Sequence, residues 1–436
     1  MASFPAAMGM TTVGLVVSYA IKAQCVLNPW ADALQYRRLC YNDIQPLFIF
    51  RGVANGLLPY VDAQYEYPVL TGLFMDLAGR VLRALATVSD VANSNENYFQ
   101  VTVLMLAPFA FFVTASLRPR VTARRLLMWS IGSPLVLYAF HNWDLIAVAL
   151  AAVALAGIED RRDGLGSSAL AAGASAKLYP LFLLPGVLLE RWSRGDGSSA
   201  VRIMTGFVAL FVLLNLPWVV LSSGVGPVFD RPEIVSLAQQ LELRDPESNG
   251  WMGIWSFHAA RYPDFGTVWF WIAHHLKAVF PSEFWRVPIE GQSSGYKDFV
   301  SIASLILFAG GSLWMLRAGW RRRKTEAEFP LISVSLGILA IFLLVSKVHS
   351  PQYALWLVPL LAMLNIPWRY VVAYFVADLG VFVSGFYYFT VMEFADPAWK
   401  GMFEVAVLTR ALALALLVWR STSAQRLLPT PAKAAQ

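Results

Sequence analysis

Residues 203–221 read IMTGFVALFVLLNLPWVVL, nineteen positions without a charged side chain. About 20 apolar residues in a helix match the hydrocarbon thickness of a bilayer. Further apolar runs lie near 6–26, 98–117, 126–140, 143–158, 297–317, 329–346, 351–364, 370–389 and 401–420. The pattern predicts an all-α polytopic membrane protein with about 10–12 transmembrane helices.

The composition agrees with a chain that lies mostly in lipid. Hydrophobic residues make up 57% of the 436 residues and charged residues only 14%, against about 25% charged residues in soluble domains. The formal net charge is +6, but no phosphate-binding glycine loop or basic–aromatic surface accompanies it. The lipid bilayer is therefore an expected partner, and nucleic acid is not.

Clusters of Arg and Lys set the expected orientation, because basic loops remain in the cytoplasm. Placing every cluster inside requires that the segment 67–88 lies along the outer surface. It also requires that 167–190 forms a re-entrant helical hairpin with its turn near Tyr179 and Pro180. The result is one transmembrane domain over residues 1–420, large extracytoplasmic loops at 28–97 and 222–296, and a disordered cytoplasmic tail over 421–436. The clusters lie at 118–125, 161–162, 191–202, 317–324 and 420–426.

The two cysteines, Cys25 and Cys40, lie near the start of the first outer loop. This side of a bacterial membrane is oxidising. A disulfide between them and a pair of free thiols are equally compatible with the sequence.

The first outer loop carries the densest group of polar side chains. Asp43 stands at the start of the apolar stretch 44–49, where it either caps a helix or acts as a functional acid near the membrane surface. Glu66 comes shortly before Pro68, in a turn that leads into the surface segment. The candidate site residues of this loop are Asp43, Arg51, Tyr60, Asp62, Glu66 and Tyr67.

Two short links that the topology places on the same face are also polar. One holds His141, Asn142 and Asp144, and the other holds Lys347, His349 and Gln352. Either group alone is compatible with an ordinary polar turn. Together they place cations and acids on the face that carries the first outer loop.

Lys177 lies inside the predicted hairpin, next to Tyr179. It either snorkels to an interface or forms a buried cation that meets a phosphate. Asp378, in the middle of another apolar run, is its counter-ion or a separate buried acid.

These residue types suit one chemistry in particular. Lys, Arg or His binds a lipid-linked phosphate, a carboxylate takes the proton of an acceptor hydroxyl, and an apolar groove holds the lipid. Glycosyl transfer from a lipid phosphate uses all three.

Several motifs resemble glycosyltransferase family 87, over about residues 40–383. They are CYNDI at 40–44, PYVD at 59–62, EYPVLTG at 66–72, NWD at 142–144, AKLYP at 176–180, NLP at 215–217 and KVHSPQY at 347–353. The resemblance implies a GT-C fold in the cell membrane, with an extracytoplasmic active site. It implies a polyprenyl-phosphate sugar donor, most often mannose, and a glycolipid or cell-envelope glycan as acceptor. The loop before Glu66 is shorter than in related sequences and lacks their cysteine.

The resemblance also implies an acid in the first outer loop as general base. This role maps onto Asp43, as the general base of an inverting hexosyltransferase without a cofactor. The leaving phosphate needs no metal if nearby cations balance its charge, although Asp62 and Glu66 could hold one. Lys177, Lys347, His349 and Arg51 are expected to balance the leaving phosphate, and Asp62 and Glu66 to bind sugar hydroxyls or hold Arg51. The alternative is a polyprenyl-linked sugar transporter or flippase without covalent chemistry. Many transporters contain internal repeats, and the sequence shows no such repeat, which argues against this alternative.

Overall fold

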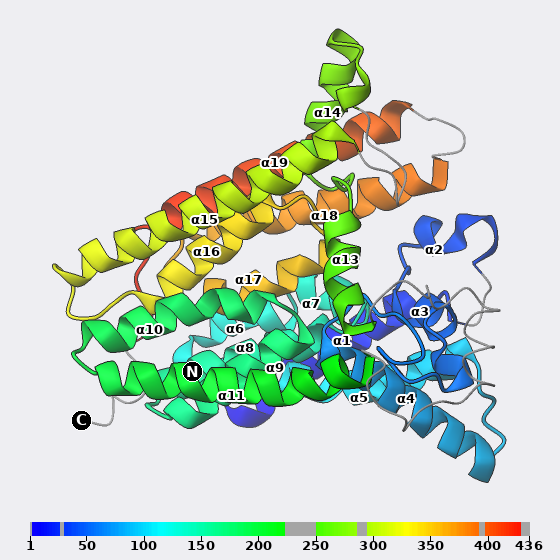
Figure 1. Cartoon of the computed structure of the whole chain (residues 1–436), viewed down its shortest axis with the longest axis horizontal. Coiled ribbons are helices and arrows are strands. Elements are labelled where there is room, and N and C mark those ends of the chain that lie inside the picture. The colour runs from blue at the N-terminus through cyan, green and yellow to red at the C-terminus, as the bar shows by residue number, and fades with distance from the viewer. Residues whose placement is uncertain (1, 27–29, 223–249, 286–293, 392–396, 429–436) are drawn as a thin grey trace.

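The computed structural model describes residues 2–26, 30–222, 250–285, 294–391 and 397–428. In these residues the regular structure is helical, without a named strand. The helices are α1 (Phe4–Ala23), α2 (Leu34–Arg37), α3 (Ile44–Phe50), α4 (Val69–Val88), α5 (Asn95–Leu117), α6 (Ala123–Ser130), α7 (Ser133–Tyr138), α8 (Asp144–Glu159), α9 (Asp163–Ala176), α10 (Leu184–Ser193), α11 (Gly197–Ser222), α13 (Gly253–Ala260), α14 (Val268–Val279), α15 (Gly295–Arg323), α16 (Leu331–Val345), α17 (Ala354–Met363), α18 (Trp368–Val391) and α19 (Pro397–Ser421). Most of the long helices run roughly along the long axis of the molecule (Figure 1).

Six helical segments of the described chain are long and apolar enough to cross a membrane: Phe4–Ala23, Asn95–Arg120, Gly197–Ser222, Gly295–Arg323, Trp368–Thr390 and Ala398–Ser421. The protein is therefore a multi-pass helical membrane protein. The helix α4, with Asp76, Arg80 and Arg83 in its sequence, is not among the six.

Three shorter apolar helices, α8, α16 and α17, lie inside the bundle. Nearly every residue of α16 and α17 is buried, and so is most of α8. A helix that is apolar on all sides is stable where other helices surround it. A helix packed against apolar helices needs an apolar surface, just as a helix packed against lipid does. The sequences of these three helices therefore resemble membrane spans.

The run 126–140 is not one helix, as the sequence predicted, but two short ones. The break falls at Ile131 and Gly132, between α6 and α7. A Cβ on Gly132 would lie 2.0 Å from the carbonyl oxygen of Met128, so this close approach requires glycine. Pro134 follows at the start of α7, a position where its missing N–H costs nothing.

The chain reverses direction between α9 and α10, near the position where the sequence placed a turn. The helix α9 ends at Ala176, Lys177 is extended, and a 3₁₀ turn covers Tyr179–Leu183. Arg191 at the end of α10 pairs with Asp163 at the start of α9, with 2.6 Å between Nη2 and Oδ1. The two ends of this segment therefore meet.

The basic clusters gather at one end of the bundle, which we call the basic end. Arg120 pairs with Glu159 at 2.9 Å, which joins the end of α5 to the end of α8. Arg194 pairs with Glu328 at 3.3 Å, which joins the end of α10 to the link before α16.

The start of the C-terminal tail is ordered, so the prediction of disorder from Ser421 is wrong as far as Leu428. Asn365 donates its backbone N–H to Gln425, and Leu427 donates to Met363. Arg426 also pairs with Glu159. Backbone pairing and a buried carboxylate fix this segment, while 429–436 lie outside the described residues.

Cys25 and Cys40 form a disulfide, which resolves the two alternatives that the sequence left open. It ties the end of α1 to the residues that precede Asp43.

Candidate active site

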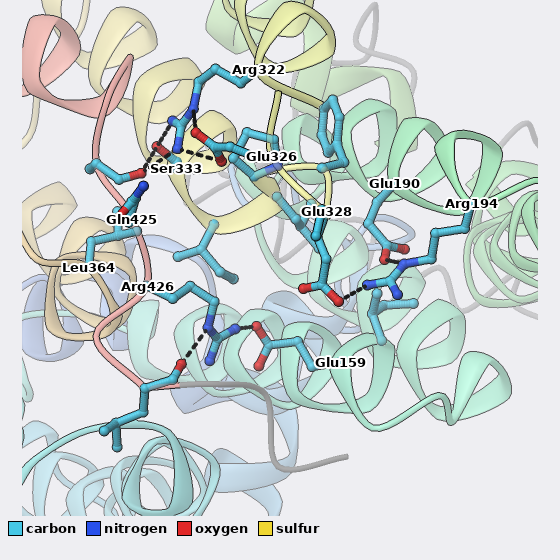
Figure 2. Close-up of a pocket in the computed structure, with 18 of the residues that line it drawn as sticks. Glu159, Glu190, Arg194, Arg322, Glu326, Glu328, Ser333, Leu364, Gln425 and Arg426 are labelled. Atoms are coloured by element: carbon cyan, nitrogen blue, oxygen red, sulfur yellow. Dashed lines mark hydrogen bonds and ion pairs between the residues drawn. The ribbon is translucent and has the colours of Figure 1, made fainter. Parts of the chain in front are cut away.

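Cavities with charged side chains in their walls lie at both ends of the bundle. The one at the basic end has a volume of about 540 Å³. Figure 2 shows its charged side chains pointing toward one another: Arg194 with Glu190 and Glu328, and Arg426 with Glu159. Arg322 pairs with Glu326 at 2.8 Å. These pairs link the α10, α15 and C-terminal segments, and we interpret this cavity as an ionic network that holds the basic end together.

Two cavities meet at Asp43, away from the basic end. The main cavity, of about 520 Å³, lies between the first outer loop, the 3₁₀ turn after α9, α13 and the 346–353 link. The side cavity, of about 260 Å³, lies toward α18 and the 264–266 loop. Asp43 and Gln352 line both cavities, as do Tyr41, Arg261 and Ser350.

Asp43 precedes α3, but its carboxylate does not cap the helix. Asn42 does so instead: its Oδ1 accepts the backbone N–H of Gln45 at 2.9 Å. The Asp43 carboxylate accepts the hydroxyl of Tyr67 at 3.3 Å. Burial raises the pKa of Asp43 above its usual value, opposed in part by a hydrogen bond from Tyr41 and by the charge of Lys177. The result is a carboxylate with increased basicity in the wall of both cavities.

Lys177 lines the main cavity and is held by a buried acid. Its Nζ lies 2.5 Å from Oδ1 of Asp144, whose other oxygen accepts the indole N–H of Trp356 at 3.1 Å. The ammonium also lies over the rings of Tyr67 and Tyr353, at 5.1 and 5.2 Å from their centroids. The cation is therefore fixed at the cavity wall by charge pairing and by aromatic faces.

The counter-ion of Lys177 is thus Asp144, and the suggestion that Asp378 fills this role is wrong. Asp378 pairs with Arg410 at 3.2 Å and accepts the Tyr138 hydroxyl at 2.8 Å. It is the separate buried acid that the sequence left as its alternative.

Of the other candidates in the first outer loop, Glu66 and Tyr67 line the main cavity. Glu66 holds Arg51 through a 2.6 Å ion pair. Tyr60 and Asp62 line neither cavity and support the loop: the Tyr60 hydroxyl donates to the carbonyl of Tyr67, and Asp62 accepts the N–H of Leu58, both at 2.8 Å.

The two polar links meet at the side cavity. His141 and His349 line the side cavity. Asn142 lines neither cavity but accepts the backbone N–H of Asp144 at 2.9 Å, which fixes the start of α8. His349 Nε2 and Gln352 Oε1 are buried and have no hydrogen-bond partner among the described residues. Such buried polar atoms are candidates for ligand contacts.

Lys347 and Tyr179 line the main cavity. The Lys347 ammonium donates to the carbonyl of Ala259 and to the hydroxyl of Ser301, both at 3.0 Å, and burial lowers its pKa to about 8. Tyr179 stacks on Trp356 with ring centroids 4.4 Å apart.

The sequence did not identify two residues of α13 and its C-terminal end. Arg261 lines both cavities and packs on the ring of Phe257. His258 lies 3.0 Å from the carbonyl of Glu66, and burial lowers its pKa to about 4, so its ring is neutral near pH 7. The signal was an arginine two residues before Pro263, at the end of an aromatic segment of the second outer loop.

The fold and the cavities together define a multi-pass helical membrane protein with a largely apolar cavity, which carries a few charged side chains, at the end away from its basic loops. The chain matches no protein-family model and no curated protein. Within the described residues, no group of three or more His, Cys, Asp or Glu side chains is placed to hold a metal ion.

Proposed function

We propose that this chain is a membrane glycosyltransferase. It moves a hexose, with mannose as the expected sugar, from a polyprenyl-phosphate carrier to a glycolipid or cell-envelope glycan. The observation that carries the proposal is the position of Asp43, a carboxylate that caps no helix and lines two adjoining cavities. A transfer reaction needs one place where two substrates meet beside a base. The family resemblance supports the same assignment.

In the proposed reaction Asp43 accepts the proton of an acceptor hydroxyl. The hydroxyl oxygen forms a bond to the anomeric carbon while the bond from that carbon to the phosphate oxygen breaks on the opposite face, so the configuration inverts. Lys177 and Arg261 in the cavity wall stabilise the departing phosphate. Lys347 and His349 contribute charge and a hydrogen bond, and Arg51 acts indirectly by fixing Glu66.

The proposed arrangement in the membrane is GT-C-like with about 10–12 crossings, and α9–α10 is the re-entrant hairpin. The basic end lies in the cytoplasm and Asp43 on the outer side of the cell membrane, as the positive-inside rule favours. The disulfide between Cys25 and Cys40 supports the same orientation, because it lies beside the Asp43 loop and needs an oxidising compartment.

The test is transfer by the purified full chain in liposomes that contain polyprenyl-phosphate [¹⁴C]mannose and an extract of envelope glycolipids. We expect label to move to an acceptor that lacks the polyprenyl chain. Movement of intact labelled donor across the bilayer without a new product would instead identify a flippase. The same assay with polyprenyl-phosphate glucose and arabinose identifies the sugar.

A further inference from the structure

The side cavity differs from the main cavity in its size and in the side chains of its wall. Its volume is about 260 Å³, against about 520 Å³ for the main cavity. Pockets for drug-sized ligands usually exceed about 300 Å³, so the side cavity suits a small unit such as a single ring. The reaction outlined above places the leaving phosphate beside Lys177 in the main cavity and leaves the side cavity unassigned.

One part of the side-cavity wall is aromatic. The ring centroid of Tyr36, in α2, lies 5.8 Å from that of Phe386 and 5.7 Å from that of Phe389, both in α18. The ring of Tyr41 lies 5.7 Å from Tyr36 and 5.9 Å from Phe386. All four rings line the cavity. Because aromatic faces are electron-rich, this part of the wall suits the C–H groups of a sugar ring and not a phosphate.

The polar part of the same wall is rich in hydrogen-bond acceptors. Gln352 is only 4% exposed, and its Oε1 has no hydrogen-bond partner within the described part of the chain. Asp43 and Asp264 also line this cavity, and among its described lining residues Arg261 is the only Lys or Arg. Hydroxyl groups can donate to amide and carboxylate oxygens, whereas two carboxylates repel a phosphate. The chemistry of this wall therefore favours an uncharged ligand with hydroxyl groups.

The loop that carries Asp264 is held in place by neighbouring segments. Its backbone N–H donates to the carbonyl of Lys347 at 2.8 Å. Two residues further on, the carbonyl of Gly266 accepts a hydrogen bond from Arg410 of α19, also at 2.8 Å. Arg410 in turn pairs with Asp378 of α18 at 3.2 Å. This part of the wall is therefore fixed before a ligand binds, as is usual for small-molecule sites.

The side cavity adjoins the main cavity at the proposed base. Asp43 and Gln352 line both cavities, whereas Lys177 and Lys347 line the main cavity and not the side cavity. A ligand in the side cavity therefore lies beside the carboxylate of Asp43, while the two lysines remain on the side of the donor phosphate.

We propose that the side cavity is the acceptor site and that it binds an uncharged sugar ring. The C–H face of this ring lies on Tyr36, Phe386 and Phe389, and its hydroxyls donate to Gln352 and Asp264. The acceptor therefore ends in a sugar residue, and not in a lipid hydroxyl or a phosphorylated group. This inference rests on the proposed function, because it names the acceptor class of that reaction.

The first experiment compares Phe389→Leu with Phe182→Leu in the full chain in liposomes. Both phenylalanines are half-buried, but Phe389 lines the side cavity and Phe182 the main cavity. Loss of an aromatic contact weakens binding about two- to tenfold. We expect Phe389→Leu to raise the KM for the acceptor glycolipid by this factor and to leave the KM for the donor within about twofold of wild type. Phe182→Leu should show the reverse.

An unchanged acceptor KM in Phe389→Leu, or a rise in its donor KM alone, would overturn the inference. If Phe389→Leu does not fold, Tyr36→Leu takes its place, because Tyr36 is half-buried in the short helix α2 and lines the side cavity but not the main cavity.

The second experiment measures sugar binding without the reaction. The probes are the methyl glycosides of mannose, glucose and arabinose, added to the full chain in phosphatidylcholine nanodiscs and observed by saturation-transfer NMR. We expect at least one glycoside to bind, and Gln352→Met to weaken that binding about two- to tenfold through loss of a hydrogen bond. Inorganic phosphate at the same concentration should not displace the glycoside. Displacement by phosphate, or no binding of any glycoside, would overturn the inference.

Failure of the proposed function gives a different result. In that case wild type transfers no sugar from any polyprenyl-phosphate donor, while a methyl glycoside still binds and Gln352→Met still weakens its binding. Transfer by wild type together with glycoside binding that is insensitive to Gln352→Met and Phe389→Leu would overturn only the assignment of the side cavity.

Discussion

The basic end and the Asp43 end both carry a cavity with charged side chains in its wall, but these charges are arranged differently. At the basic end, Arg194, Arg322 and Arg426 each pair with a glutamate. At the other end, Asp43 pairs with no cation, and His349 and Gln352 keep buried polar atoms without a partner among the described residues. Mutual neutralisation fixes a structure, whereas incompletely paired groups around a cavity are suited to bind a ligand.

Asp43→Asn gives the largest expected effect. The amide cannot take a proton from the acceptor, so transfer should fall by about 10²–10⁴ without loss of folding. The measurement is initial rate of sugar transfer, with the melting temperature in detergent as a check on folding. Asp62→Asn is the matched comparison, because Asp62 belongs to the same loop but lines neither cavity. Equal losses in the two variants would remove the distinction between them.

Glu159→Ala tests the basic end. The substitution removes the carboxylate partner of Arg426 and one of the two carboxylate partners of Arg120. Arg120 still pairs with Asp160, at 2.6 Å. Breaking a buried ion pair costs about 3–5 kcal/mol of stability. Because the pair between Arg120 and Asp160 remains, we expect a loss near the lower figure. The measurement is chemical unfolding in detergent, together with kcat of the folded fraction. A fall in kcat at unchanged stability would show that this end also takes part in the reaction.

The sequence anticipated the architecture better at some places than at others. Apolar runs found the six long helices, and Pro180 marked the reversal after α9, because both signals are local. The same apolarity concealed that α16 and α17 are short and interior. The ordered tail was missed because its partners, Met363 and Asn365, are about 60 residues away in sequence.

In the site, residue types were predictable and pairings were not. Lys177 and Asp144 were both candidates, but no local pattern joins two residues 33 positions apart. The sequence around Asp43 is compatible both with a helix cap and with a functional acid, so the sequence alone could not assign its role. Only the hydrogen bond from Gln45 N–H to Asn42 distinguishes them.

Lys347 gives the smallest expected effect. Its pKa of about 8 means that its charge is lost as pH rises through that value, so a phosphate in the main cavity should then bind more weakly. We expect the KM for the donor to rise about two- to fivefold between pH 7 and pH 9 in wild type. Lys347→Arg stays charged throughout and should show a flatter profile.

Stability should change in the opposite direction over the same range. Because burial depresses the pKa of Lys347 from 10.5 to about 8, the unfolded chain binds more protons between these values. The contribution of this residue to stability therefore increases with pH in that interval. We expect the melting temperature of wild type relative to Lys347→Arg to rise from pH 8 to pH 10 while donor affinity falls. A parallel fall of both would indicate that alkaline unfolding, and not loss of a phosphate contact, explains the change in KM.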